Sequence, residues 1–518
     1  MKAPPDKGLR MDDLTRRAKN HQGLTTIAPD RRRVAPYRRG LAVVTLFSWL
    51  LLDLFTPVLA QGQAERALDA VRDLIVSGEV QPNAVLRLAF KQGNVNAYLG
   101  NDLELQREWE QQTGIVLETR IIPQLPIQQV IATSKDIDLT VARNHEFPEL
   151  IPLGLIEDLG PLFEEFGFSL DDDPYTGFIR PDLQAYLGER IAAIPADGDP
   201  IVMYLRRDLM EDPRERKAFR EATGRDLAVP ETWEEYETLV RFFHRPEKGL
   251  FGAVEERDPE GAWMFWLPRY LSMKLPYQPL FDANMRPLID SPQGIAATES
   301  YIAMASYSPP GIDKDGNNYS FTLPFYMQGK AFATMFTIAA AKLLNGDNSP
   351  IRDKYFAAPI PGTRIDGRLV RRNTIIYGNN LVIPKDAANR KLAFLYAMWI
   401  TSPEISPRSV GVRGGFTDPY RWHHLRDSRI LEIYSAQALE VFANTWPVTL
   451  PPGTGIPGDS EYLETLNTNL TAAIRGELTA TEAMTKTAAS WEAITDRLGR
   501  ESQIENWKAF TSNFRVGP

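Results

Sequence analysis

The chain has 518 residues, of which 43% are hydrophobic and 24% charged, the composition of a globular protein with room for two or more domains. It contains no cysteine, which excludes disulfides, thiolate nucleophiles, cysteine-ligated zinc and iron–sulfur clusters. The formal net charge of −9 argues against a nucleic-acid partner, because phosphate contacts need clustered Lys and Arg.

Residues 1–60 have the pattern of a signal peptide with a long basic leader. Basic runs at 31–33 and 38–39 precede an apolar stretch at 41–54, which is shorter than the ~20 residues that span a bilayer. Small residues at the end of 58–60 predict cleavage after position 60, with an uncleaved anchor as the alternative. Since a bacterial lipid anchor needs a cysteine there, we expect a periplasmic protein that is not a lipoprotein. The chain from residue 61 carries −15.

The first predicted elements alternate between helices and strands. Residues 61–82 form an amphipathic helical extension, and Val85–Phe90 follows as a strand. Glu104–Gln112 predicts a helix and Ile115–Ile122 a second strand, so the two strands pair in parallel with helices on the sheet faces. Asp136–Ala142 predicts another buried strand.

The middle and end of the chain are richer in helix. Thr232 predicts the N-cap of a helix that ends near Phe243, and Phe325–Met335 predicts a helix running into a strand. Residues 459–475 and 479–498 predict closing helices.

The stretch Thr374–Glu404 combines a strand with a helix. Its apolar run contains a Gly378-Asn379-Asn380 break, and glycine in a strand permits a bend or the close approach of another group. After Pro384, apolar residues at helical spacing predict a helix that stops at Thr401-Ser402-Pro403.

This stretch and several others resemble, in order, segments of the family 1 extracellular solute-binding proteins of sugar-type ABC importers. The similar segments are LQREWEQQTGIVLETRII (105–122), DIDLTVARNHEFPELIPLGLIEDLGPLF (136–163), IPADGDPIVMYLRRDLMED (194–212), VPETWEEYETLVRFF (229–243), FYMQGKAFATMFTIAA (325–340), the unit at 374–404 and NTNLTAAIRGELTATEAMTKTAASWEAI (467–494). The resemblance implies a two-lobed α/β periplasmic-binding-protein fold (type II). Each lobe would be a mostly parallel sheet flanked by helices, with three crossings near 197–203, 372–378 and 412–418.

The resemblance also implies how the chain divides between the lobes. The expected ranges are lobe 1 at 83–198 and 374–414, and lobe 2 at 199–373 and 415–518 including a C-terminal tail. The helix at 61–82 and a proline- and glycine-rich segment, Trp446–Asp459, depart from the family pattern. The latter could reshape the ligand cleft or act as a lid.

The ligand site is expected where strand ends and crossings meet, because ligands of open α/β sheets bind at the carboxyl ends of strands. Saccharides stack on aromatic rings and take hydrogen bonds from planar polar groups. The candidate ligand-binding residues are Lys91, Gln92, Asn94, Arg143, Asn144, His145, Asp197, Asp199, Trp263, Trp266, Tyr377, Asn379 and Arg413.

Structural roles compete with these assignments. Trp263 and Trp266 could pack in a core, His145 could belong to a turn, and Arg143 and Arg413 could form salt bridges. Asp197-Gly198-Asp199 could be only a hinge turn. Tyr377, beside Gly378, is the position that the pattern favours most.

We expect a binding protein without catalytic residues, cofactor or metal. The sequence has no Gly-x-Ser-x-Gly elbow, P-loop or His-Glu-x-x-His motif, and His423-His424 are adjacent rather than four apart. The expected partners are a carbohydrate or polyol ligand and an inner-membrane ABC permease, with the protein a monomer. A sensory or scaffold protein on the same fold and a secreted glycoside-acting enzyme are the alternatives.

Overall fold

The computed structural model describes residues 61–123, 126–134, 136–171 and 173–517. The expected signal peptide at 1–60 lies outside these residues. Within them, no helix combines the length and apolar character that crossing a membrane requires.

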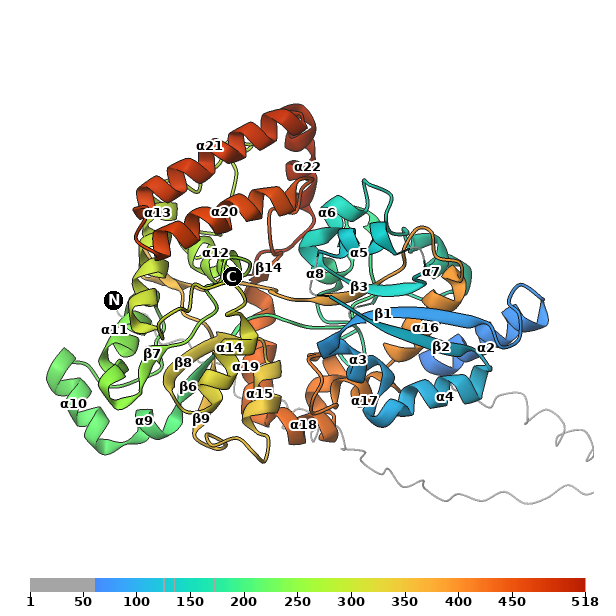
Figure 1. Cartoon of the computed structure of the whole chain (residues 1–518), viewed down its shortest axis with the longest axis horizontal. Helices are drawn as coiled ribbons and strands as arrows, with labels where there is room; N and C mark the ends of the chain where they lie inside the picture. Colours follow the sequence, from blue (N-terminus) through green and yellow to red (C-terminus); the bar gives the residue numbers. More distant parts are fainter. Residues whose placement is uncertain (1–60, 124–125, 135, 172, 518) are drawn as a thin grey trace, which may run out of the picture. The chain divides into compact units, whose positions relative to one another are not determined.

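A four-stranded sheet, in the order β13-β3-β1-β2, forms the centre of the first lobe (Figure 1). Its strands are β1 (Val85–Lys91), β2 (Val116–Ile122), β3 (Leu139–Arg143) and β13 (Asn379–Val382). β1 pairs in parallel with both β2 and β3, whereas β13 runs antiparallel to β3. The predicted parallel pair of the first two strands is confirmed.

Helices surround this sheet. They are α2 (Gln63–Val76), α3 (Gln92–Leu99), α4 (Glu104–Thr113), α5 (Ile127–Thr133), α6 (Phe147–Leu150), α7 (Gly160–Phe166), α8 (Pro181–Gln184), α16 (Arg390–Ile400) and α17 (Ser406–Val410). The helix expected at the start of the described chain is α2, whose buried face includes Leu68 and Val71. The helix predicted after Pro384 is α16, and nine of its eleven residues are buried.

The second lobe has its own four-stranded sheet, in the order β7-β8-β6-β9. Its strands are β6 (Val202–Arg206), β7 (Phe251–Ala253), β8 (Ala331–Phe336) and β9 (Tyr355–Ala358). Only β7 and β8 pair in parallel, and β6 is antiparallel to both β8 and β9. The expectation of a mostly parallel sheet therefore holds for the first lobe and is wrong for the second. The chain enters β6 from the first lobe, and β6 runs antiparallel to the strands on both sides of it.

The second lobe contains a further set of helices. They are α9 (Arg207–Glu211), α10 (Pro213–Thr223), α11 (Trp233–Phe243), α12 (Ala262–Leu271), α13 (Pro292–Ala303), α14 (Tyr319–Met327), α15 (Ala339–Leu344), α18 (Ser428–Tyr434), α19 (Ala436–Thr445), α20 (Asp459–Ile474), α21 (Ala480–Leu498) and α22 (Arg500–Ser512). Thr232 caps α11 in a capping box with Glu235, as predicted. α22 was not predicted from the sequence.

Three segments join the two sheets. The first leaves Ile194, which bridges to Leu381, and enters β6. The second runs from the short strand β12 (Asn373–Thr374), which pairs with β14 (Thr449–Leu450), to β13. The third connects α17, packed on α3, with α18, packed on α15. The two-lobed fold with three crossings is confirmed.

Gly378 lies at the bend in the second crossing. Its φ of +30° is in the left-handed region, and a Cβ there would come 2.4 Å from Asn144 Oδ1. A side chain at this position would therefore push the crossing away from the first lobe.

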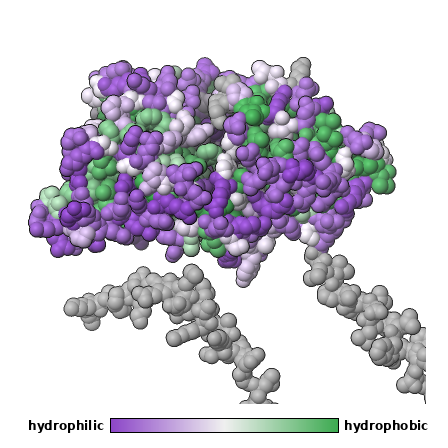
Figure 2. Space-filling view, turned by 60° about the horizontal axis from the view of Figure 1, so that its bottom comes forward, coloured by the Kyte–Doolittle hydropathy of each residue, from purple (hydrophilic) through white to green (hydrophobic). Residues whose placement is uncertain are grey.

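The apolar residues of both sheets form the core, and the surface is largely polar. Figure 2 shows a mostly hydrophilic face on which hydrophobic residues occupy separate patches. Two hairpin-like pairs, β4 (Tyr186–Leu187) with β5 (Arg190–Ile191) and β10 (Thr363–Ile365) with β11 (Arg368–Val370), complete the strand set.

Candidate functional site

A small cavity of about 40 Å³ lies where the strand ends of the first lobe meet the second lobe and the crossings. Seven of the predicted residues line it: Lys91, Asn94, Arg143, Asp197, Asp199, Tyr377 and Asn379. The other lining residues are Gly93, Tyr319, Phe336, Thr337 and Phe416. We call this space the inner cavity.

The fold explains why these residues meet. Lys91 and Arg143 are the last residues of the parallel neighbours β1 and β3, so they reach the same edge of the sheet. Asn379 opens β13 and pairs with Arg143 across the ladder. Asp197 and Asp199 come from the first crossing.

A second space of about 60 Å³ shares Arg143, Tyr319 and Tyr377 with the inner cavity. Its remaining lining residues are Glu256, Asp258, Glu260, Gly261, Met264 and Asn318. The Tyr377 hydroxyl donates to Glu256, 2.7 Å from one carboxylate oxygen and 2.8 Å from the other. The Arg143 guanidinium lies 5.2 Å from the centroid of the Tyr377 ring, within cation–π range.

Most charged groups of the two spaces are buried, whereas Arg143 is partly exposed and Glu260 is exposed. Burial, and then the neighbouring Asp258, raises the pKa of Glu256 to about 8, and burial with Glu260 raises the pKa of Asp258 to about 6. Burial, and then the positive Arg143, lowers the pKa of Lys91 to about 7. Proton occupancy of these groups therefore changes near neutral pH.

Asp258 is short of hydrogen-bond donors. Neither of its carboxylate oxygens has a well-aligned donor among the described residues, although the N–H groups of Glu260 and Gly261 lie close enough to hold its pKa down in part. A buried acceptor without a donor is a site where a ligand hydroxyl gains a full hydrogen bond.

Four aromatic rings form the apolar wall of the inner cavity. The centroid of Tyr319 lies 5.7 Å from those of Tyr377 and Phe416 and 6.0 Å from that of Phe336. Phe336 and Tyr377 are 5.8 Å apart. Rings from the second lobe and from two crossings thus surround one small space.

The structure does not bring the other six predicted residues to these two spaces. Gln92 is exposed at the start of α3. Trp266 is fully buried and donates to Thr298, so it belongs to the core of the second lobe. Arg413 is exposed and pairs with Glu432 at 2.9 Å.

The remaining three lie next to the site but face elsewhere. Asn144 donates to the carbonyl of Leu183 and accepts from Asn380, which makes it a structural tie. The His145 ring packs edge-on against Trp263 at 5.4 Å, so these two join the lobes by an aromatic contact. Burial lowers the pKa of His145 to about 4 and keeps the ring neutral.

A larger groove of about 480 Å³ lies beyond Asn144. Its walls include Phe147 and Tyr186 of the first lobe, Phe510 of α22, and Pro451 and Pro452 of the proline- and glycine-rich segment. That segment therefore borders a groove next to the lobe boundary. The groove lacks the convergence of buried charged groups that marks the inner cavity.

Sequence reasoning missed the contribution of the second lobe, chiefly Glu256, Asp258, Tyr319, Phe336 and Phe416. Glu256 and Asp258 directly follow β7, and Phe336 ends β8, so the strand-end rule applied to the second lobe would have found them. Tyr319 and Phe416 carry no comparable local signal.

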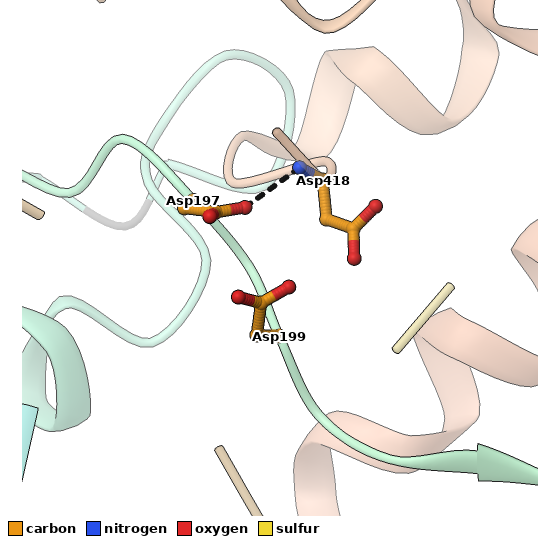
Figure 3. A group of neighbouring side chains, drawn as sticks. All are labelled: Asp197, Asp199 and Asp418. Carbon is orange, nitrogen blue, oxygen red and sulfur yellow. Dashed lines mark hydrogen bonds between the residues drawn. The ribbon is translucent and has the colours of Figure 1, made fainter. Parts of the chain in front are cut away.

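One further group lies against the inner cavity. Asp197, Asp199 and Asp418 turn their carboxylates toward one another (Figure 3). The Asp418 N–H donates to Asp197 at 2.7 Å. Asp418 itself accepts from Tyr434 and from the N–H of Ala339 at the start of α15.

Comparison with known proteins decides the family. The family model of the bacterial extracellular solute-binding proteins matches residues 104–406, more than half of the chain. The chain belongs to this family. No curated protein matches the sequence.

Solved structures of solute-binding proteins share its fold at low sequence identity. The maltose-bound MalE3 of T. maritima superposes with a TM-score of 0.65 at 20% identity, covering 79% of this chain and 100% of that one. An ABC transporter solute-binding protein from Agrobacterium radiobacter K84 in complex with ribitol gives 0.65 at 18%, covering 79% and 98%. One from Thermotoga lettingae bound to α-D-tagatose gives 0.63 at 19%, covering 79% and 99%.

Proposed function

We propose that this solute-binding protein is the periplasmic receptor of an ABC importer, which captures a sugar, oligosaccharide or polyol and delivers it to an inner-membrane permease. The observation that carries the proposal is the inner cavity, where buried polar groups and four aromatic rings converge from both lobes and from the crossings. The maltose, ribitol and tagatose complexes of the structural neighbours support the same ligand class.

The composition of the site supports a polyhydroxylated, uncharged ligand. Carboxylates and amides accept hydrogen bonds from hydroxyls, and the rings offer flat apolar faces. Five acidic residues against two basic ones line the two spaces, namely Asp197, Asp199, Glu256, Asp258 and Glu260 against Lys91 and Arg143. Sugar phosphates should therefore bind worse than the parent sugars.

The volumes of the site imply hinged closure. Spaces of about 40 and 60 Å³ hold a few water molecules, because one water occupies roughly 30 Å³ in the liquid. A sugar ring is several times larger, so binding requires the lobes to separate at the crossings and to close again around it. The permease would respond to the closed form, which the ligand favours by binding it better.

The test is a thermal-shift screen of the purified protein against mono-, di- and oligosaccharides, polyols and sugar phosphates. A true ligand should raise Tm progressively with its concentration, as linkage requires. No shift across the whole panel would refute the proposed ligand class.

Two variants test the placement of the site. Tyr377→Ala removes a ring and the donor to Glu256, and should weaken binding by more than about tenfold, or 1.4 kcal/mol. Arg413→Ala is the control, because Arg413 forms an exposed ion pair away from the cavity, and its affinity should equal that of the wild type. Wild-type affinity in Tyr377→Ala would place the ligand elsewhere, for instance in the groove of about 480 Å³.

A further inference from the structure

Asp197, Asp199 and Asp418 form a compact, buried group of oxygen ligands. Each offers one carboxylate oxygen, and the three oxygens lie within 4.8 Å of one another (Figure 3). Asp197, Asp199 and Asp418 are 1%, 2% and 0% exposed, respectively. Three oxygens this close together can bind one cation, because ligand oxygens on the same Ca²⁺ or Mg²⁺ lie no more than about twice a bond of roughly 2.0–2.6 Å apart.

Several oxygens around this group have no hydrogen-bond donor among the described residues. They are Asp197 Oδ2, Asp199 Oδ1 and the amide oxygen of Asn379. Asn379 is 8% exposed, carries no charge and lines the same inner cavity as Asp197 and Asp199. Three acceptor oxygens without a donor in one place indicate a missing partner, and a cation can serve all of them at once.

The charges of the group are not balanced by the protein groups around it. Lys342 is the cation whose charge acts on all three carboxyls. Its ammonium donates to the carbonyls of Gly415 and Thr417 at 2.9 and 2.8 Å, not to the carboxylates. If all three carboxylates were ionised, they and the ammonium would leave a charge of −2 on residues that are at most 2% exposed, which is costly unless it is neutralised.

We propose that a divalent hard cation, Ca²⁺ in preference to Mg²⁺, binds between Asp197, Asp199 and Asp418. The donors are all oxygen, which selects hard cations over zinc or copper. Ca²⁺ accepts irregular sets of protein oxygens, whereas Mg²⁺ needs near-octahedral geometry and keeps its bound water, so a buried site built from protein oxygens favours Ca²⁺. One such ion brings the local charge to zero.

The site has a mechanical consequence. Asp197 and Asp199 belong to the first crossing, whereas Asp418 belongs to the third. A cation held by all three ties these crossings together at the point about which the lobes hinge. It also fixes the two carboxylates that face the inner cavity.

Proton sharing is the competing arrangement. Burial, together with the neighbouring carboxyls, raises the pKa of Asp197 and of Asp199 well above the usual range, and burial raises that of Asp418. Without a cation, the group can therefore hold protons at neutral pH. Protons and a cation compete for the same oxygens, so an experiment can separate them.

The experiment measures Tm of the chelator-treated full chain with CaCl₂, with MgCl₂ and with neither. At a Ca²⁺ concentration about 100 times its Kd, Tm should rise by about 3 °C, with a smaller rise for Mg²⁺ at equal concentration. Metal analysis after gel filtration in Ca²⁺ should find one ion per chain. An unchanged Tm together with no bound metal would overturn the proposal in favour of shared protons.

Asp199→Asn tests the location of the ion, because the amide is nearly isosteric and removes one charge. Ca²⁺ affinity should fall by at least about tenfold while the far-ultraviolet spectrum stays that of the wild type. Asp459→Asn is the matched control, since Asp459 is also fully buried with one unpartnered oxygen but lies outside the group. Equal Ca²⁺ affinity in both variants would place the ion elsewhere and overturn the proposal.

A second measurement does not depend on that variant. The Trp446 ring lies against the backbone of Gly198, between two of the proposed ligands. Tb³⁺, a luminescent substitute for Ca²⁺, should show tryptophan-sensitised emission that Ca²⁺ displaces and that Trp446→Phe strongly reduces. Undiminished emission in Trp446→Phe would contradict this location.

Discussion

The two faces of one short segment, Glu255–Asp258, carry acidic residues in two different roles. Alternate side chains of an extended segment point in opposite directions. Glu255 and Arg257 point into the core of the second lobe, whereas Glu256 and Asp258 line the cavity of about 60 Å³. The comparison shows what separates a structural carboxylate from one that is available to a ligand.

On the core face every charge has a partner. Glu255 accepts from Arg257 at 2.8 Å, from Arg269 at 3.4 Å and from the Tyr236 hydroxyl at 2.6 Å. Although burial opposes it, the positive charges of Arg269 and Arg257 hold the pKa of Glu255 below its usual range. Glu256 accepts from the Tyr377 hydroxyl and lies close to the Tyr319 N–H, and it still has a raised pKa. Both residues are at least 97% buried. Their pKa values differ because two arginines offset the burial of Glu255.

Breaking the core face should have the largest effect. Arg257→Met leaves Glu255 buried with one cation fewer, and should lower the free energy of unfolding by about 3–5 kcal/mol in urea. Arg413→Met, which removes an exposed ion pair, should lower it by no more than about 0.5 kcal/mol. Similar losses in the two variants would mean that burial of the Glu255 network contributes nothing.

A smaller loss should follow when Glu255 keeps both arginines and loses only its neutral donor. Tyr236→Phe removes a buried hydrogen bond to a charged group and should cost about 2 kcal/mol. Tyr175→Phe changes an exposed tyrosine and should be neutral. The comparison is made by urea unfolding at neutral pH. If Tyr236→Phe were equally neutral, the hydroxyl would not contribute to holding Glu255 ionised.

Replacing the carboxylate on the cavity face should raise the free energy of unfolding instead of lowering it. Glu256 has a folded pKa of about 8 against an ordinary 4.5, so the folded state binds its proton more tightly than the unfolded chain does. Its ionisation therefore lowers stability as pH rises from about 4.5, and the full penalty is present above about 8. Glu256→Gln should leave stability unchanged near pH 4 and raise it by about 1–2 kcal/mol near pH 9.

Glu255→Gln is the matched variant on the other face. The pKa of Glu255 is lowered, so its contribution exists above the unfolded pKa and disappears as pH falls through the folded value. The destabilisation caused by Glu255→Gln should therefore shrink in acid, where Glu256→Gln also has no effect. Parallel pH profiles for the two variants would contradict the comparison. Urea unfolding followed by tryptophan fluorescence from about pH 4 to about pH 9 gives both curves.

Much of the fold was predictable because periodic patterns determine it locally. The apolar spacing of α2 and α16 and the Thr232 cap gave helices that the structure confirms. The antiparallel pairing of β6 was not predictable, because strand direction depends on which lobe the chain comes from. α22 was not predicted, although Ile504, Trp507 and Phe510 recur at helical spacing; of its residues only Gln503 and Trp507 are buried.

The residues of the candidate site were likewise predictable only where a local pattern determines their position. Lys91, Arg143 and Asn379 follow from strand ends, which a sequence reveals. The tryptophans and Arg413 rested on residue type and family position alone, and the structure gives Trp266 and Arg413 other surroundings. Glu256 and Asp258 lie in a charged run of four that resembles a solvated turn. Only the three-dimensional alternation separates the two that line the cavity from the two that face the core.

Helix α2 has a practical consequence for anyone who wishes to shorten the protein. The family match begins at residue 104, which invites a truncation that starts near the first strand. Yet Ala67, Leu68 and Val71 cover an apolar strip of α16, and Gln63 bonds to Met398 at its end. A protein trimmed to Val85 would present that strip to water and would self-associate through it. The smallest soluble version of this protein therefore begins some forty residues before the family match does.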